Sequence, residues 1–80
     1  MNFRELFEIS MNPYMEREEF YGTLEEAKAE ADDMITYTQQ NIVIYKDGLE
    51  VTRRTWCGVA PDEEEENIIE IGGGYYSDWT

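Results

Sequence analysis

The segment that most constrains the fold is residues 23–38, because it is the only long stretch with a clear helical period. Thr23 is a candidate N-cap, and Glu26 three residues later completes a capping box. Gly22 lets the chain turn into the helix without the steric cost of a Cβ atom. The residues that recur at helical spacing on one face are Leu24, Ala27, Ala31, Met34, Ile35 and Thr38. We therefore predict one helix near residues 24–37 that packs on a sheet through a narrow, alanine-rich face.

The second strong signal is Asp47-Gly48, which lies between two β-rich runs at residues 42–45 and 49–56 and predicts a tight hairpin. A two-residue turn predicts the pairings Ile44–Val51 and Ile42–Arg53. It places on the helix-facing side Ile42, Ile44, Leu49 and Val51. A three-residue turn that includes Lys46 predicts instead the pairings Tyr45–Leu49 and Val43–Val51. The sequence leaves both registers open.

Residues 3–11 alternate between apolar and polar side chains, which is typical of a half-buried strand. The apolar members are Phe3, Phe7, Ile9 and Met11. A competing helical pattern runs through Phe3, Leu6, Phe7 and Ser10. We favour the strand, because Asn12-Pro13 ends the segment quickly and isoleucine and phenylalanine prefer sheets.

The remaining segments complete a single small domain of 80 residues. Residues 12–22 are expected to form a connection, residues 61–67 a mobile acidic loop, and residues 67–71 a last strand. The three glycines that begin the aromatic tail at residues 72–80 allow the chain to bend back, and we expect Trp79 to dock on the body of the protein. The predicted fold is α+β, with the order strand, helix, strand, strand, strand.

The net charge of −13, from 19 acidic and 6 basic residues, limits the choice of partners. Phosphates would be repelled over most of the surface, so we expect neither direct nucleic-acid binding nor membrane binding. The start of the chain shows no signal-peptide pattern, and the single Cys57 cannot form an internal disulfide, so the expected location is cytoplasmic. The acidic surface either only keeps the protein soluble or binds a partner with a basic surface.

Catalytic and metal-binding chemistry finds little support in the sequence. The absence of histidine excludes histidine-based catalysis and Cys/His zinc sites. Cys57 near Arg53 and Arg54 could act as a thiolate, but a small residue at a strand end is the favoured interpretation. The run at residues 62–66 lacks the spacing of an EF-hand loop, and residues 72–74 lack the lysine of a phosphate loop. We therefore predict no catalytic residue, no metal site and no cofactor, with a small enzyme as a distant third hypothesis.

Three groups of side chains are candidates for binding a partner. The first is the polar helix face: Glu25, Glu26, Glu30, Asp32 and Asp33. The second is the acidic run: Asp62, Glu63, Glu64, Glu65 and Glu66. The third is aromatic: Trp56, Tyr75, Tyr76 and Trp79. Tyr and Trp are favoured interface anchors, although in a small domain they are also core material, and the sequence leaves both roles open.

Several short motifs along the chain carry a resemblance. They are Thr23-Leu24-Glu25-Glu26-Ala27, Tyr37-Thr38-Gln39, Ile42-Val43-Ile44, Asp47-Gly48, Arg53-Arg54-Thr55-Trp56 and Gly74-Tyr75-Tyr76-Ser77-Asp78-Trp79. With them the chain resembles small uncharacterised acidic proteins of phages and mobile elements from gut Gram-positive bacteria, a group that brings no known activity.

Two functional hypotheses follow from the charge and the aromatic residues. The first is a non-enzymatic protein-binding module, in its sharpest form an inhibitor that mimics nucleic acid and occupies the basic groove of a host nucleic-acid-binding protein. The second is an accessory protein that associates through an apolar surface or a sheet edge, for example as a homodimer.

Overall fold

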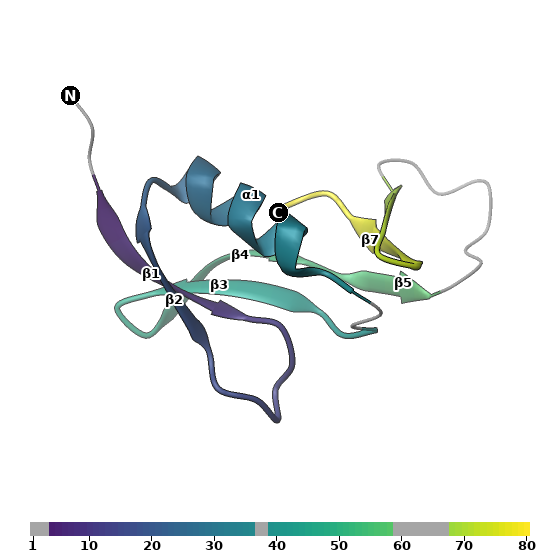
Figure 1. Ribbon diagram of the computed structural model, residues 1–80, viewed down its shortest axis with the longest axis horizontal. Helices are drawn as coiled ribbons and strands as arrows, with labels where there is room; N and C mark the ends of the chain where they lie inside the picture. Colours follow the sequence, from purple (N-terminus) through teal and green to yellow (C-terminus); the bar gives the residue numbers. More distant parts are fainter. Residues whose placement is uncertain (1–3, 37–38, 59–67) are drawn as a thin grey trace.

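The computed structural model describes residues 4–36, 39–58 and 68–80. Within these residues the chain forms one α-helix packed on an antiparallel sheet, with a second, smaller antiparallel sheet beside it, which confirms the predicted α+β class (Figure 1). The elements are β1 (Glu5–Ser10), β2 (Glu18–Gly22), α1 (Leu24–Met34), β3 (Ile42–Lys46), β4 (Leu49–Arg54), β5 (Trp56–Gly58), β6 (Ile68–Ile71) and β7 (Gly74–Ser77).

The predicted order of one strand before the helix is wrong, because β2 lies in the segment that we expected to be a connection. This strand pairs antiparallel with β1 and places Phe20 opposite Phe7. Its pattern is hard to recognise locally, since two acidic residues and a glycine surround a single inward-facing aromatic. The first segment is a strand as predicted, and a turn at residues 12–15 separates it from β2.

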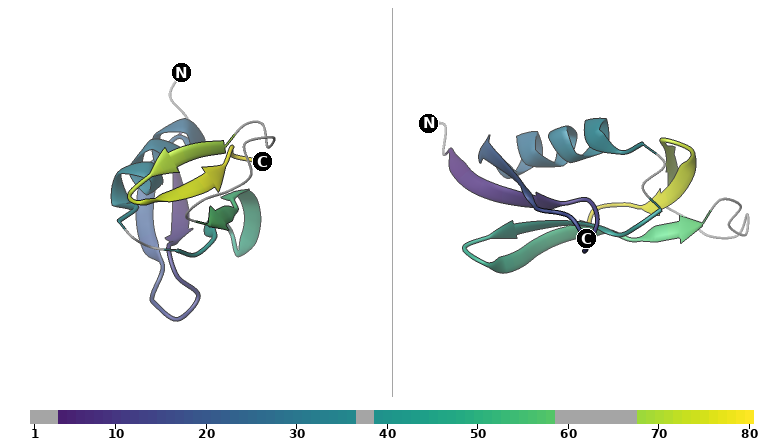
Figure 2. Two further views of the ribbon diagram at one scale, coloured as in Figure 1. Left: turned by 90° about the vertical axis from the view of Figure 1, so that its right-hand side faces the viewer. Right: turned by 60° about the horizontal axis from the view of Figure 1, so that its bottom comes forward.

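The larger sheet has the strand order β2-β1-β3-β4, and α1 covers one of its faces (Figure 2). Alternate side chains of β1 and β3 point toward the helix, which meets them with two small residues. The buried core that results contains Phe7, Ile9, Ala27, Ala31, Ile35, Ile42, Ile44 and Tyr76. Alanine at the contact lets the helix approach the sheet closely, as its narrow face predicted.

The helix begins where its capping box predicts and ends earlier than expected. The hydroxyl of Thr23 accepts a hydrogen bond from the Glu26 backbone N–H (3.2 Å), and the Glu26 carboxylate accepts one from the Thr23 N–H (3.0 Å). The helix stops at Met34, and Ile35 adopts an extended conformation. Its last turn contains two acidic residues and no basic residue, an arrangement that interacts unfavourably with the negative end of the helix dipole.

The β3–β4 hairpin turns at Asp47-Gly48, as predicted. Both residues have positive φ, 53° and 80°, which is the geometry of the two-residue turns that favour Asp-Gly. Lys46 pairs with Leu49 across the turn, so the alternative three-residue turn is not adopted.

Beyond the turn, the predicted pairing is wrong, because β4 contains a bulge. The register shifts between Tyr45 and Ile44, so that Ile44 pairs with Thr52 instead of Val51. From this point inward-facing and outward-facing residues of β4 exchange places. Val51, expected on the helix side, is 42% exposed, whereas Arg54 is buried. Leu49 lies before the bulge, next to the turn, and is exposed at the tip of the hairpin rather than in the core.

The C-terminal residues form a second sheet with the strand order β5-β7-β6 instead of a simple tail. Gly72 and Gly73 make the turn between β6 and β7, with φ values of 56° and 89°. After β7 the chain runs along β4, where the Thr80 backbone exchanges hydrogen bonds with Arg53 (3.1 and 3.3 Å). Trp79 packs against the core, so its predicted docking is confirmed.

Candidate protein-binding site

The acidic residues of α1 divide into those with a structural partner and those without one. Glu26 caps the helix, and its hydrogen bonds with Thr23 lower the pKa of its carboxyl group. Glu25 forms an ion pair with Lys28 at 3.4 Å. Asp32 accepts two hydrogen bonds from the buried guanidinium of Arg54. These three side chains therefore have local roles and are weak candidates for binding a partner.

The remaining two acidic residues of the helix face, Glu30 and Asp33, are exposed and form no ion pair with the described residues. Of the six basic residues in the sequence, five form ion pairs with other carboxylates of the described residues. These pairs are Arg17–Glu8, Lys28–Glu25, Lys46–Glu5, Arg53–Glu50 and Arg54–Asp32. The protein therefore has few cations left to neutralise the carboxylates at its surface.

The aromatic candidates contribute mainly to the fold. Tyr76 is fully buried. Trp56 and Trp79 pack against the core, and their indole N–H groups are buried and donate to no partner among the described residues. Tyr75 is half-buried and hydrogen-bonds Glu70, which raises the pKa of its hydroxyl. The acidic run at residues 62–66 lies outside the described residues.

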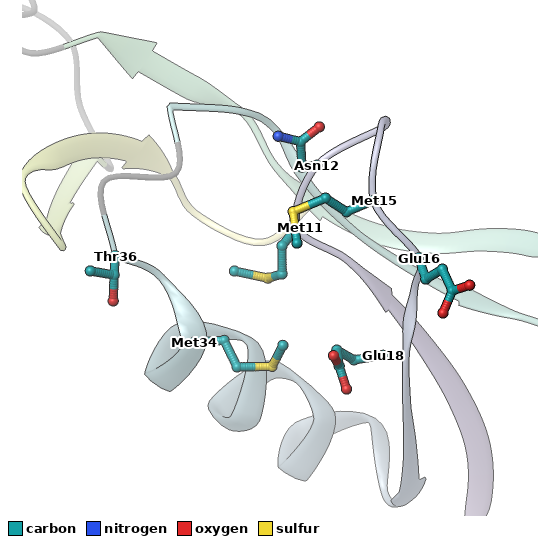
Figure 3. Close-up of a pocket in the computed structure, with 7 residues that line it drawn as sticks. All are labelled: Met11, Asn12, Met15, Glu16, Glu18, Met34 and Thr36. Atoms are coloured by element: carbon teal, nitrogen blue, oxygen red, sulfur yellow. The ribbon is translucent and has the colours of Figure 1, made fainter.

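A hollow that the sequence did not predict lies between the C-terminal end of α1 and the start of the β1–β2 connection. Its volume is about 370 Å³, and its lining residues are Met11, Asn12, Met15, Glu16, Glu18, Met34 and Thr36. All three methionines within the described residues are among them. In Figure 3, Met11 and Met34 face the same space, and the carboxylate of Glu18 lies beside Met34. We call this feature the methionine hollow.

Local structure explains how the side chains reach the methionine hollow. Asn12 accepts hydrogen bonds from the backbone N–H groups of Tyr14 (2.8 Å, side chain) and Met15 (3.1 Å, carbonyl), which closes a turn. This turn leaves Tyr14 90% exposed and Met15 68% exposed. Glu18 pairs with Ile9, a residue that faces the helix, so its carboxylate lies on the helix side of the sheet.

The charge around the methionine hollow is negative. Glu16 and Glu18 are exposed and form no ion pair with any described residue, and no basic side chain is in the lining. The helix that ends at Met34 adds the negative end of its dipole. The hollow thus combines adaptable apolar thioethers with uncompensated negative charge, an arrangement that suits an apolar side chain next to a cation.

The sequence contained partial signals for this site. Three of the four methionines flank the Asn12-Pro13 turn or end the predicted helix. Their convergence is not visible in the sequence, because residues 12–22 predict a connection and the direction of Glu18 depends on the pairing of β2 with β1.

Three further features of the described residues concern metal binding, the cysteine and membrane insertion. No group of three metal-ligating side chains lies together within residues 4–36, 39–58 and 68–80. The Cys57 thiol donates a hydrogen bond to the Thr55 carbonyl oxygen, with a sulfur–oxygen distance of 3.4 Å. No helix in the described part of the chain is long and apolar enough to span a bilayer. Comparison with known proteins finds no matching family model, curated protein or solved structure.

Proposed function

We propose that this protein is a non-enzymatic acidic module that binds a partner protein through that partner's basic surface. The observation that carries the proposal is the set of exposed carboxylates without an ion pair in the described residues. Those around the methionine hollow and on the last turns of α1 are Glu16, Glu18, Glu30 and Asp33. Uncompensated charge of one sign speeds encounter with a partner of the opposite sign and disfavours like-charged partners.

The sharpest form of the proposal is an inhibitor from a phage or mobile element, acting in the cytoplasm, that occupies the nucleic-acid groove of a host protein. Carboxylates on alternate residues of an extended segment recur about every 6–7 Å, which is comparable to the phosphate spacing of an extended strand. Glu18 is the first residue of β2 and Glu16 lies two residues before it, so the two carboxylates are at alternate positions of the chain. The net charge of −13 supports the same form.

A displacement assay tests this proposal. Labelled duplex DNA is bound to each of a panel of purified basic DNA-binding proteins, and the acidic protein is titrated in at 50 and 300 mM salt. We expect displacement at low salt for at least one panel member and a steep loss at high salt. Exchanging Glu16 and Glu18 for glutamine should weaken displacement. The matched control exchanges Glu5 and Glu50, which are already ion-paired, and should act like wild type.

Two results would contradict the proposal. One is that no panel member releases its DNA at any concentration at which the protein stays monomeric. The other is that the control exchange weakens displacement as much as the exchange of Glu16 and Glu18. The first would argue against nucleic-acid mimicry, and the second would argue against a localised acidic site.

A second candidate function is apolar association, for example as a homodimer, and one observation favours it. On the sheet face opposite α1, Leu6 and Tyr21 pair in register and are 50% and 64% exposed. Neighbouring exposed apolar side chains of this kind favour association that does not weaken with salt. Sedimentation velocity at low and high salt, with a Leu6→Ser and Tyr21→Ser variant as the monomer control, distinguishes this function from the first.

A further inference from the structure

We infer that the methionine hollow is a socket for one large apolar side chain, such as leucine or phenylalanine, from a lysine- or arginine-rich segment of the partner. This inference rests on the proposed function, because it assumes a basic protein partner, and it specifies the chemistry by which that partner is recognised. Its occupant is defined by the size of the hollow, by its thioether lining and by the charge at its edge.

The size of the hollow fits a side chain better than a whole secondary-structure element. About 370 Å³ lies at the low end of the roughly 300–1,000 Å³ that is common for small-molecule sites. The exposed tip formed by Tyr14 and Met15 stands next to it, in a connection that projects from the body of the protein (Figure 1). An inserted side chain would therefore contact Met11 and Met34 within the hollow and Met15 at its edge.

The thioether side chains decide which apolar side chains the socket can accommodate. Methionine is unbranched and polarisable, so three methionines can adapt to leucine, methionine or phenylalanine with little loss of contact. Tight selection among these apolar residues is not expected. Selection instead comes from charge, because no lining residue is basic and the exposed carboxylates of Glu16 and Glu18 have no ion pair in the described part of the chain.

The end of α1 favours a cation at the same place. Met34 is the last helical residue, and the last turn contains no basic residue of its own; the Arg54 guanidinium, which reaches this turn from β4, is paired with Asp32. Lysine or arginine on either side of the apolar anchor would thus meet the two carboxylates and the carbonyl end of the helix. An acidic segment would be repelled from each of these groups, so the structure predicts recognition of apolar residues only in a basic context.

Three synthetic nine-residue peptides test the inference. The first has a central leucine flanked by lysines, the second replaces the leucine with serine, and the third replaces the lysines with glutamates. Binding is followed through the ¹³C-labelled methyl groups of the methionines by NMR. We expect the lysine–leucine peptide to shift the signals of Met11, Met15 and Met34 and to bind about tenfold or more tightly than the serine peptide. The glutamate peptide should leave all signals in place.

Protein variants with matched controls locate the contact. Met15→Ser and Glu18→Gln should each weaken the lysine–leucine peptide several-fold, and both side chains are exposed, so the fold should persist. Leu49→Ser is the control for the first, since Leu49 is as exposed at another hairpin tip, 72% against 68%. Glu19→Gln is the control for the second, because Glu19 neighbours Glu18 in β2 but pairs with Glu8 on the opposite sheet face.

The outcomes separate this inference from the proposed function. If the leucine and serine peptides bind equally and shift no methionine methyl group, the socket is refuted, whatever the displacement assay shows. If the peptides give that negative result but the protein still displaces DNA, the proposed acidic module is supported and only the socket is refuted. If Leu49→Ser or Glu19→Gln weakens the peptide as much as its counterpart, binding is spread over the surface and the socket is likewise refuted.

Discussion

Replacing Arg54 with methionine would remove a buried guanidinium while keeping most of the side-chain volume. Its Nε and Nη2 donate to the Asp32 carboxylate at 2.8 and 3.1 Å, and its Nη1 donates to the Ser77 carbonyl at 2.7 Å. The same group lies 4.7 Å from the centre of the Trp79 ring. These contacts join α1 and β4 to the C-terminal segment, so the substitution should loosen all three.

The expected magnitude follows from the burial of the two partners. The Arg54 side chain is 6% exposed, whereas that of Asp32 is 32% exposed and would regain some hydration after the substitution. Removing one partner of a fully buried ion pair costs about 3–5 kcal/mol, so we expect a loss of about 2–4 kcal/mol here. A domain of 80 residues has a free energy of unfolding of about 4–12 kcal/mol, so this loss is a large share.

Urea unfolding followed by circular dichroism measures the free energies for wild type, Arg54→Met, Asp32→Asn and the double variant. We expect Asp32→Asn to lower the free energy of unfolding by about 1–3 kcal/mol in wild type and to leave it almost unchanged in the Arg54→Met background. Asp33→Asn is the matched control, because Asp33 is adjacent and exposed, and it should change stability by less than about 0.5 kcal/mol. Equal costs of Asp32→Asn in both backgrounds would refute the reasoning.

Three further predictions concern the turns, the pH dependence and the C-terminus. Gly72→Ala should lower the melting temperature far more than Gly48→Ala, because both have positive φ but only the Cβ at Gly72 would lie 2.5 Å from a backbone oxygen. Hydrogen bonds lower the folded pKa of Glu26 (from Thr23) and of Glu50 (from Arg53). The contribution of these two carboxylates to stability is therefore complete above the unfolded pKa and is lost as pH falls through the folded pKa. A variant with glutamine at both positions should consequently show a smaller drop in melting temperature between pH 6 and pH 3 than wild type. Trp79→Ala should lower the free energy of unfolding by about 2 kcal/mol, because Trp79 packs against the core. The fluorescence emission of Trp79, measured in a Trp56→Phe background, should be blue-shifted. Emission like that of free tryptophan in water would contradict the docked position.

The sequence by itself determined the features that depend on neighbours a few residues apart. The helix begins at Thr23 because the capping box satisfies two backbone N–H groups locally. The hairpin turns at Asp47-Gly48 because these residues accept positive φ. The class α+β follows from these two signals and from the alternation in the first strand. The overall excess of negative charge was also visible without any structure.

Only the tertiary structure decided which side chains share a face. A one-residue bulge in β4 exposes Val51 and buries Arg54, and no local signal marks it. The bulge thereby brings Arg54 to Asp32 and removes that carboxylate from the acidic helix face that the sequence predicted for binding.

The candidate site likewise depends on contacts between distant segments. Met11 and Met34 are 23 positions apart in the sequence and line the same hollow because β1 packs against α1 (Figure 3). Glu18 points to the same side only through the pairing of β2 with β1. Sheet register has a period of two residues, so one inserted residue or one missed strand reverses the face of every side chain that follows. Local patterns therefore predicted the elements, while long-range pairing decided their surfaces.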